Sequence, residues 1–502
     1  MNSRYGGKGK VRKVLTFALA ASLTVGLLAG CSSTDKGKDS KEEKVLRIGM
    51  LHGSNDDSWF RQQYTDIYEF NNNVRIEIVP AVDSSEYRYR DYSNEQYVEP
   101  DYYEGMKKLM TSSNPVDIVI ADTNTLKRLA EENLLKPLDP MIQEDKFDTS
   151  DFVPAVIDSI KDIGGDNKLY GLSPTFSSSA LYYNKKIFAD AGIEPPTDGM
   201  TWDEVFEKAR LVSKGEGKDR VYGFSFNRYL GSEPYWDMQY SYVSTLQLRV
   251  HDEKAERMTV NSPQWQKVWE TISKLAKDKI IPSSMNMNMD EYYSEENYSP
   301  ISGDLFLSGK LAMMLGESYY INEITEANNN ADKIKNFNPV DWDIVTMPVH
   351  PENPGIGGNI WVGNTFSINS TAPNAEVAWD YIKFVNGEDF AKLRSRSNSY
   401  EMVSRKSHIT PKAGLSYNIE AFYQLKPIPP DSAAEEKLKR EIPGLNNIPH
   451  SGRPHFQEVL ENKKTPEEAL KDWEEKGNKM LLELKKNPNA HFNEDGSVYQ
   501  MN

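Results

Sequence analysis

Cysteine is almost absent from this chain, which has one, Cys31, among 502 residues. A single cysteine excludes an intramolecular disulfide and a cluster of thiolate metal ligands. The motifs Gly-x-Ser-x-Gly, Gly-x-x-x-x-Gly-Lys and His-Glu-x-x-His are missing as well. The seven histidines are scattered, and the closest pair, His450 and His455 with Glu458 nearby, is a weak candidate for a metal site. The sequence therefore predicts no catalytic residue, no metal and no cofactor.

Positive charge is also in short supply. Acidic residues outnumber basic ones by 75 to 59, which gives a formal net charge of −16. Residues 1–30 hold five basic residues and no acid, so their removal would leave −21. Such a chain disfavours nucleic acid and anionic lipid headgroups as partners. With so many carboxylates, pairs such as Asp56-Asp57 are inevitable and do not by themselves indicate a glycosidase.

The first thirty residues have the composition of an export signal. Five basic residues precede a mostly apolar run from Val14 to Gly30 that ends in small residues. This order is typical of a secretory signal peptide, residues 1–30. A retained transmembrane anchor is the less favoured alternative, because 17 residues are marginal for crossing about 30 Å of hydrocarbon.

Cys31 stands directly after this run. The sequence Leu28-Ala29-Gly30-Cys31 resembles the lipobox of bacterial lipoproteins, in which the thiol receives a diacylglyceryl group and becomes the mature N-terminus. Two or more acyl chains hold a protein stably at a membrane surface. The alternative is an ordinary cysteine in a cleaved signal. Residues 31–44 would form a flexible tether, since 32–44 contain no apolar side chain.

Beyond the tether, strand-like and helix-like segments alternate. Val45–Leu51, Val74–Ile78 and Ile118–Ala121 have the apolar runs or the alternation of strands. Helices are expected after three N-terminal signals: Thr201–Glu204, Ser262-Pro263 and Thr465-Pro466. Alternation over this length predicts an α/β fold with mainly parallel sheets, and the tryptophans on these helices should pack in the core. The Tyr-rich stretches 86–104 and 285–302 lack a period and are expected to be surface insertions.

Ordered blocks recur across almost the whole mature chain. The central ones are Leu169–Pro174, Leu181–Phe188, Ala191–Pro196 and Thr201–Glu204. The others, in chain order, are Pro115–Asp122, Leu134–Leu138, Phe306–Met314, Trp342–Pro348, Gly357–Trp361, Phe366–Ile368, Ala378–Phe384 and Thr465–Leu470. Together they resemble family 1 extracellular solute-binding proteins, the maltose-binding-protein-like receptors of bacterial ABC importers. Each block is weak alone, but their order behind a lipobox makes the resemblance specific.

The resemblance implies a fold. We expect a two-lobe periplasmic-binding-protein-like fold (type II) of the α/β class, hinge-linked, with the ligand cleft between the lobes. Lobe 1 should take residues 45–176 plus 343–385, and lobe 2 residues 177–342 plus 386–502.

Candidate ligand-binding residues come from two sources. Ligands of open α/β sheets bind beyond the carboxyl ends of strands, a rule that selects Trp59 after the first strand and Asp122 and Asn124 after the strand ending at Ala121. The resemblance adds Ser177 and Ser179 at the crossover. It also adds Tyr319, because the segment Gly316–Tyr320 occupies the position where sugar-binding relatives often have Gly-x-Trp, and the aromatic residue here is Tyr319 or Tyr320. Gly358 would let the backbone approach the ligand closely, with Trp361 beside it. Trp236 joins them from the aromatic and polar segment Pro234–Tyr242.

Three of these assignments have open alternatives. Asp122 is equally suited to cap a helix. Tyr235 and Trp236 can instead cover a core. The role of Glu317 is undecided from sequence.

The predicted function is that of a receptor and not an enzyme. Hydroxyls of a glycan suit Asp, Asn and Ser, and its apolar faces suit Tyr and Trp, so an oligosaccharide is the favoured ligand. We expect a lipid-anchored receptor on the extracellular face of the bacterial cell membrane, touching the membrane through its N-terminal lipid only and delivering ligand to ABC transporter permease subunits. The alternatives are a surface-anchored glycan hydrolase and a receptor of the same fold for a peptide or other polar solute.

Overall fold

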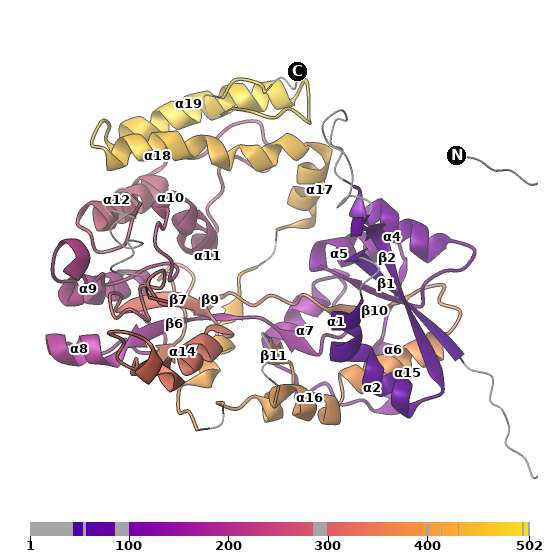
Figure 1. Ribbon diagram of the computed structural model, residues 1–502. Coiled ribbons are helices and arrows are strands. Elements are labelled where there is room, and N and C mark those ends of the chain that lie inside the picture. The colour runs from indigo at the N-terminus through magenta and orange to yellow at the C-terminus, as the bar shows by residue number, and fades with distance from the viewer. Residues whose placement is uncertain are drawn as a thin grey trace, which may run out of the picture. The chain divides into compact units, whose positions relative to one another are not determined.

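The computed structural model describes residues 44–53, 57–85, 100–284, 299–397, 401–412, 414–429, 431–493 and 496–499 (Figure 1). The predicted signal peptide, Cys31 and all but the last residue of the tether lie outside the described residues, as do most of the two Tyr-rich stretches. Residues 45–502 group as one unit, which is the part described below.

The first sheet has five strands in the order β2-β1-β3-β10-β4. Its strands are β1 (Lys44–Gly53), β2 (Val74–Asp83), β3 (Ile118–Ala121), β4 (Leu135–Lys136) and β10 (Thr365–Asn369). β1 and β3 are parallel, with Ile48 opposite Ile118, whereas β10 runs antiparallel to β3, with Phe366 opposite Ile120. Every residue of β3 is buried, as expected of a strand that is covered on both faces.

Helices cover the first sheet: α1 (Ser58–Phe60), α2 (Asp66–Asn71), α4 (Tyr102–Thr111), α5 (Thr123–Glu131), α6 (Asp139–Asp145), α7 (Pro154–Lys161), α15 (Ala375–Val385) and α16 (Glu388–Ser395). Helices α2 and α4 pack on β2, and α15 packs on β10. The predicted surface insertion 86–104 extends too far. Its last residues belong to α4, where Tyr103 is buried and its hydroxyl donates to Glu132. We call the buried residues around this sheet the first core; they run from Leu46 to Phe176 and from Val362 to Phe390.

The second sheet has three strands in the order β7-β6-β8. They are β6 (Ser179–Asn184), β7 (Met313–Glu317) and β8 (Trp342–Val345), and both pairings are antiparallel. The expectation of mainly parallel sheets is wrong here, since an apolar run does not show which way its neighbour runs. Leu181 and Tyr183 pack in one apolar cluster and Ala180 and Tyr182 in another, as the two-residue period of a strand requires.

A helical layer surrounds the second sheet: α8 (Lys185–Ala191), α9 (Trp202–Val212), α10 (Pro234–Asp237), α11 (Ser244–Leu246), α12 (Pro263–Lys277), α14 (Tyr320–Asn329), α17 (Ala433–Glu441), α18 (Arg453–Leu460) and α19 (Pro466–Leu484), with a π-helix at Met238–Val243. Helices α12, α18 and α19 pack together (Figure 1). The capping boxes at Thr201 and Thr465 are confirmed, and Trp202, Trp265 and Trp473 are buried as predicted.

The chain passes between the cores over a few residues. Phe176 belongs to the first core and Ala180 to a cluster on the second sheet. Short strands run alongside: β5 (Thr175–Phe176) pairs with β11 (Met402–Val403), and β9 (Ile356–Gly358) pairs with β12 (Lys426–Pro427). Three chain segments, near residues 177, 360 and 402–426, therefore meet at this crossing.

Candidate functional site

A hollow of about 220 Å³, here called the crossing hollow, lies where β6 and β7 reach the crossing segments. It brings together the predicted residues Ser179 and Tyr319 with Glu317, the last residue of β7. Its lining is Ser179, Phe226, Asn227, Arg228, Tyr229, Ser241, Met314, Leu315, Gly316, Glu317, Tyr319, Tyr320, Met347 and Asn359. Aromatic rings, amides and hydroxyls together suit a solute with both apolar faces and hydroxyl groups.

Ser179 links the hollow to the return crossing. It is buried, and its hydroxyl accepts a hydrogen bond from Asn359 Nδ2 at 3.1 Å. Two residues earlier, Ser177 exchanges backbone hydrogen bonds with Trp361, each 2.9 Å long. The hollow is therefore built partly from the strands that join the two cores, so a solute bound in it touches the joint.

Arg228 is tied to acidic residues behind the wall of the hollow. Its Nη1 and Nη2 donate to the carboxylate of Glu323, the second at 3.0 Å, and Nη1 lies 3.7 Å from Asp304 Oδ2. The guanidinium also lies 4.6 Å from the centre of the Tyr320 ring. Burial raises the pKa of Asp304 to about 6, even though the Tyr320 hydroxyl and backbone amides donate to it.

A second carboxylate, the partly buried Asp237, holds Asn227 in place. Asn227 lines the hollow and donates from Nδ2 to Asp237 Oδ1 at 3.1 Å, while the Ser232 hydroxyl donates to Oδ2. Burial raises the pKa of Asp237 to about 6. Asp237 ends α10, so this pair fixes the Asn227 amide against the helix that leads to Ser241. Sequence analysis missed Asn227 and Arg228, which carry no local motif.

The strand-end candidates lie elsewhere. Asp122 caps α5, because its carboxylate accepts from the Thr125 amide at 3.0 Å and the Thr125 hydroxyl at 2.9 Å. Asn124 is exposed on the same helix. Trp59 on α1 is 62% exposed. Of the two possibilities for Asp122, the helix cap is present, and none of these three residues lines the crossing hollow.

Gly358 and Trp361 belong to the return crossing. A Cβ atom at Gly358 would lie 2.9 Å from the Leu425 carbonyl oxygen and 3.1 Å from that of Lys426, so the small size of Gly358 admits the backbone at the start of the neighbouring strand β12. Trp361 is 58% exposed and is held at its backbone by Ser177. An exposed indole beside the crossing leaves Trp361 available to a solute.

Trp236 faces a separate hollow of about 250 Å³ between α10 and the C-terminal helices. Its ring lies 4.6 Å from His450 and 6.0 Å from Tyr240, centre to centre. The preceding Tyr235 is buried, with its hydroxyl donating to the Pro449 carbonyl. The core alternative thus holds for Tyr235, whereas Trp236 only partly packs on the core.

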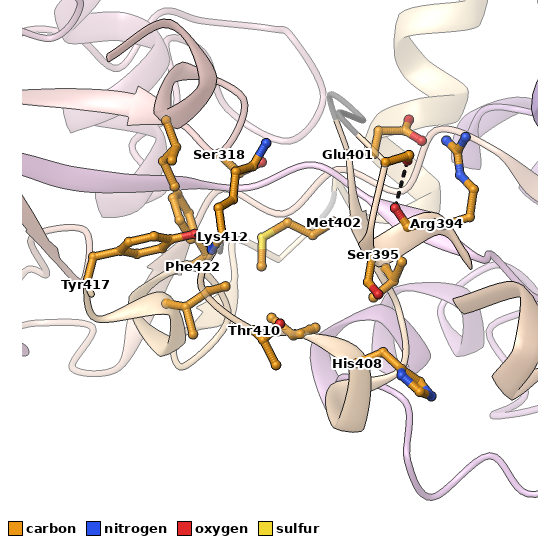
Figure 2. A pocket seen from close by; sticks show the side chains of 15 residues that line it. Ser318, Arg394, Ser395, Glu401, Met402, His408, Thr410, Lys412, Tyr417 and Phe422 are labelled. Carbon is orange, nitrogen blue, oxygen red and sulfur yellow. Dashed lines mark hydrogen bonds between the residues drawn. The ribbon is translucent and has the colours of Figure 1, made fainter. Parts of the chain in front are cut away.

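A third cavity, of about 70 Å³, was not predicted from sequence (Figure 2). It lies between α16 and the segment 401–422, with Met402 between Lys412 on one side and Arg394 and Glu401 on the other (Figure 2). Burial lowers the pKa of Lys412. Glu401 accepts from the Thr175 hydroxyl at 2.5 Å, which connects this cavity to the crossing strand β5.

The described ranges contain no group of three or more side chains able to hold a metal ion. His455 Nδ1 lies 3.7 Å from Glu458, whereas the His450 ring packs at a tilt against Trp236, so the two histidines of the weak candidate metal site lie in different environments. None of the helices in the described part of the chain is long and apolar enough to cross a membrane.

Comparison with known families assigns the chain. The family model described as bacterial extracellular solute-binding protein matches residues 57–392, more than half of the sequence. The chain belongs to this family of solute-binding proteins. The resemblance inferred from the ordered sequence blocks is thereby confirmed.

Individual relatives are distant. A protein of Brucella abortus named as a binding protein is 23% identical over 382 residues, which cover 75% of this chain and 83% of its own. The sn-glycerol-3-phosphate-binding periplasmic protein UgpB of Escherichia coli K12 is 23% identical over 443 residues, which cover 82% of this chain and 91% of its own.

Solved structures show the fold. A sugar transporter protein from Rhizobium etli, in an open conformation, has a TM-score of 0.59 at 20% identity, with 87% of this chain and 99% of that one covered. The sugar-binding protein MalE of Xanthomonas citri has a TM-score of 0.58 at 14% identity, covering 88% and 98%. This solute-binding protein has their two-lobe α/β periplasmic-binding-protein fold, as predicted.

Proposed function

We propose that this protein is a lipid-anchored extracellular receptor that captures a polar solute, an oligosaccharide in the first instance, and delivers it to an ABC importer. The observation that carries the proposal is the crossing hollow. Aromatic Tyr319 and polar Asn227, Ser179 and Asn359 line one space beside the strands that join the two cores. A solute that gains contacts on both sides of a joint favours the state in which those contacts coexist.

We also propose a division into lobes that follows the cores. Residues 45–176 build the first core, and Val362 to Phe390 return to it, while β8 pairs in the second sheet. We therefore place the return to lobe 1 after β8, and α16 with lobe 1, where the sequence alone suggested boundaries at 342/343 and 385/386.

The receptor proposal is tested by a thermal-shift panel. Binding to the native state raises apparent stability in proportion to ln(1 + [L]/Kd). Residues 32–502, the mature chain without its lipidated Cys31, are mixed with neutral di- and trisaccharides, peptides and polyols, and the sugars are then analysed for cleavage. We expect a saturable rise in melting temperature with one class of oligosaccharide and an intact sugar. Shortened sugar would support the hydrolase alternative, and a shift with peptides alone would replace the ligand class.

A further inference from the structure

The crossing hollow and the residues behind it carry more acidic than basic side chains. Among the residues that the structure describes, Arg228 is the only basic one that lines the hollow. Both terminal nitrogens of Arg228 donate to Glu323, one of them also lies near Asp304, and Nη2 donates to the Tyr229 hydroxyl at 2.9 Å. Bidentate pairing uses the guanidinium geometry that a phosphate or carboxylate of a solute would need. Arg228 is therefore already occupied by the protein's own carboxylates.

Glu317 adds a further negative charge at the surface of the same hollow. It is exposed, and no basic residue among those the structure describes forms an ion pair with its carboxylate. Its backbone is fixed, since the Tyr182 hydroxyl donates to the Glu317 carbonyl at 2.9 Å. Asp304 and Glu323 pair with Arg228, and Glu317 stands apart from that pair, so three carboxylates are balanced by one guanidinium and the local formal charge is negative when the acids are ionised.

An anionic group that enters this hollow is repelled by Glu317 and finds no free cation among the described residues that line it, because Arg228 is already paired with Glu323 and Asp304. Like charges brought together at a binding surface oppose association and so discriminate between partners. An uncharged hydroxyl loses nothing to Glu317 and can donate to it, and an ammonium group gains an ion pair. The relative UgpB is named for binding sn-glycerol-3-phosphate, an anion, so charge is a property in which this chain should differ from it.

We propose that the crossing hollow selects solutes without negative charge, with Glu317 as the residue that excludes phosphorylated and carboxylated ones. The proposal rests on the receptor function proposed above and narrows its substrate class to neutral saccharides and amino sugars.

The test compares matched probes by calorimetric titration. The neutral oligosaccharide with the largest thermal shift is measured beside its uronate and its 2-amino counterparts, together with sn-glycerol-3-phosphate. The chains are the wild type, Glu317→Gln, and the control Glu326→Gln, which removes an exposed carboxylate on α14 away from the hollow. We expect the wild type to prefer the neutral sugar over its uronate by about tenfold or more, as one nearby unit charge allows.

Glu317→Gln should shrink that preference, the ratio of the two affinities, by about tenfold, and Glu326→Gln should leave both affinities unchanged. A uronate or sn-glycerol-3-phosphate that binds wild type as tightly as the neutral sugar overturns the selectivity and leaves the receptor function standing. An unchanged preference in Glu317→Gln overturns the role of Glu317. Absence of binding by every probe overturns the receptor function, and this inference with it.

Discussion

At the scale of single residues, the crossing hollow is lined by two predicted ligand-binding residues, Ser179 and Tyr319. It is also lined by residues that no sequence pattern indicates. Ser179 and Tyr319 are 140 positions apart, and the resemblance to a family was enough to select both. Arg228 follows Ser225, which pairs with Met314 of β7, and Glu323 lies 95 positions further along the chain on α14, so their mutual neutralisation could not be read from either local sequence.

Tyr319 supplies the first prediction. Its ring lines the crossing hollow, so Tyr319→Ala should weaken binding of the cognate sugar by about 1–3 kcal/mol, the value of burying a large side chain. The measurement is calorimetric titration, with Tyr499→Ala as the control, because Tyr499 is 53% exposed and outside the hollow. Equal affinity in wild type and Tyr319→Ala would remove Tyr319 from the binding surface.

Asp237 gives a pH prediction. Its folded pKa of about 6 lies above the ordinary value of 3.8, so the folded state binds a proton more tightly than the unfolded state. Its contribution to stability is therefore greatest below pH 3.8 and is lost as pH rises toward 6. In Asp237→Asn the remaining Oδ1 can accept from Asn227 while the new Nδ2 donates to the Ser232 hydroxyl, so the variant should raise the free energy of unfolding at pH 7 by about 1 kcal/mol.

Urea denaturation of both chains between pH 4 and pH 7 measures this effect. The gain of Asp237→Asn over wild type should grow with pH across that window. A constant difference at all pH values would mean that Asp237 has an ordinary pKa.

At the scale of elements, local signals were the most reliable guide. The capping boxes at Thr201 and Thr465 satisfy helix-end amides with neighbouring side chains, so the sequence alone carries them. Strand direction in the second sheet failed because pairing depends on segments more than 100 residues apart. Tyr102 and Tyr103 were wrongly assigned to a surface insertion, because α4 begins directly after a stretch in which apolar residues show no helical or strand period.

Helix α17 is the element with a role that sequence analysis did not indicate. Its Glu436 pairs with Lys127 of α5 at 2.9 Å, and both side chains are only 10% exposed. Its Glu435 pairs with Arg249, and Leu438 packs against the core that includes Trp202. Helix α17 therefore connects α5, which belongs to the first core, with the core of the second sheet.

Breaking the Lys127–Glu436 pair should be costly. Lys127→Ala leaves a carboxylate buried without its partner, so the free energy of unfolding should fall by about 3 kcal/mol. The double variant Lys127→Met with Glu436→Leu should recover most of that loss. The control is Lys186→Ala, whose exposed pair with Asp190 should be worth at most about 0.5 kcal/mol.

Denaturant unfolding measures the free energy of unfolding of the wild type, Lys127→Ala, the double variant and Lys186→Ala. Equal losses for Lys127→Ala and Lys186→Ala would show that α17 does not depend on this pair. Such a result would mean that α17 only packs on the core of the second sheet and does not connect it to α5.

At the scale of the whole molecule, we propose that an N-terminal lipid anchor is joined to a two-lobe receptor. The anchor rests on Cys31 and the run before it, and the receptor on the family and the crossing hollow. The tether has no apolar side chain, so the anchor and the solute should be independent of each other.

Replacing the anchor residue tests this independence. Cys31→Ser should abolish lipid labelling and either release the protein or leave an uncleaved precursor, as judged by fractionation and mass spectrometry. The affinity for solute should not change, because the tether separates the two functions. Membrane-bound, normally processed Cys31→Ser protein would contradict the lipoprotein assignment.

The central claim is that a solute is captured at the joint between two lobes without being converted. Periplasmic binding proteins close around their ligand by a hinge motion. A ligand drives this closure only if it contacts both lobes in the closed state and not in the open one. Small-angle X-ray scattering of residues 32–502, with and without a saturating neutral oligosaccharide, measures it most directly. The account predicts a smaller radius of gyration with the sugar recovered intact; an unchanged radius at saturation would contradict capture between the lobes.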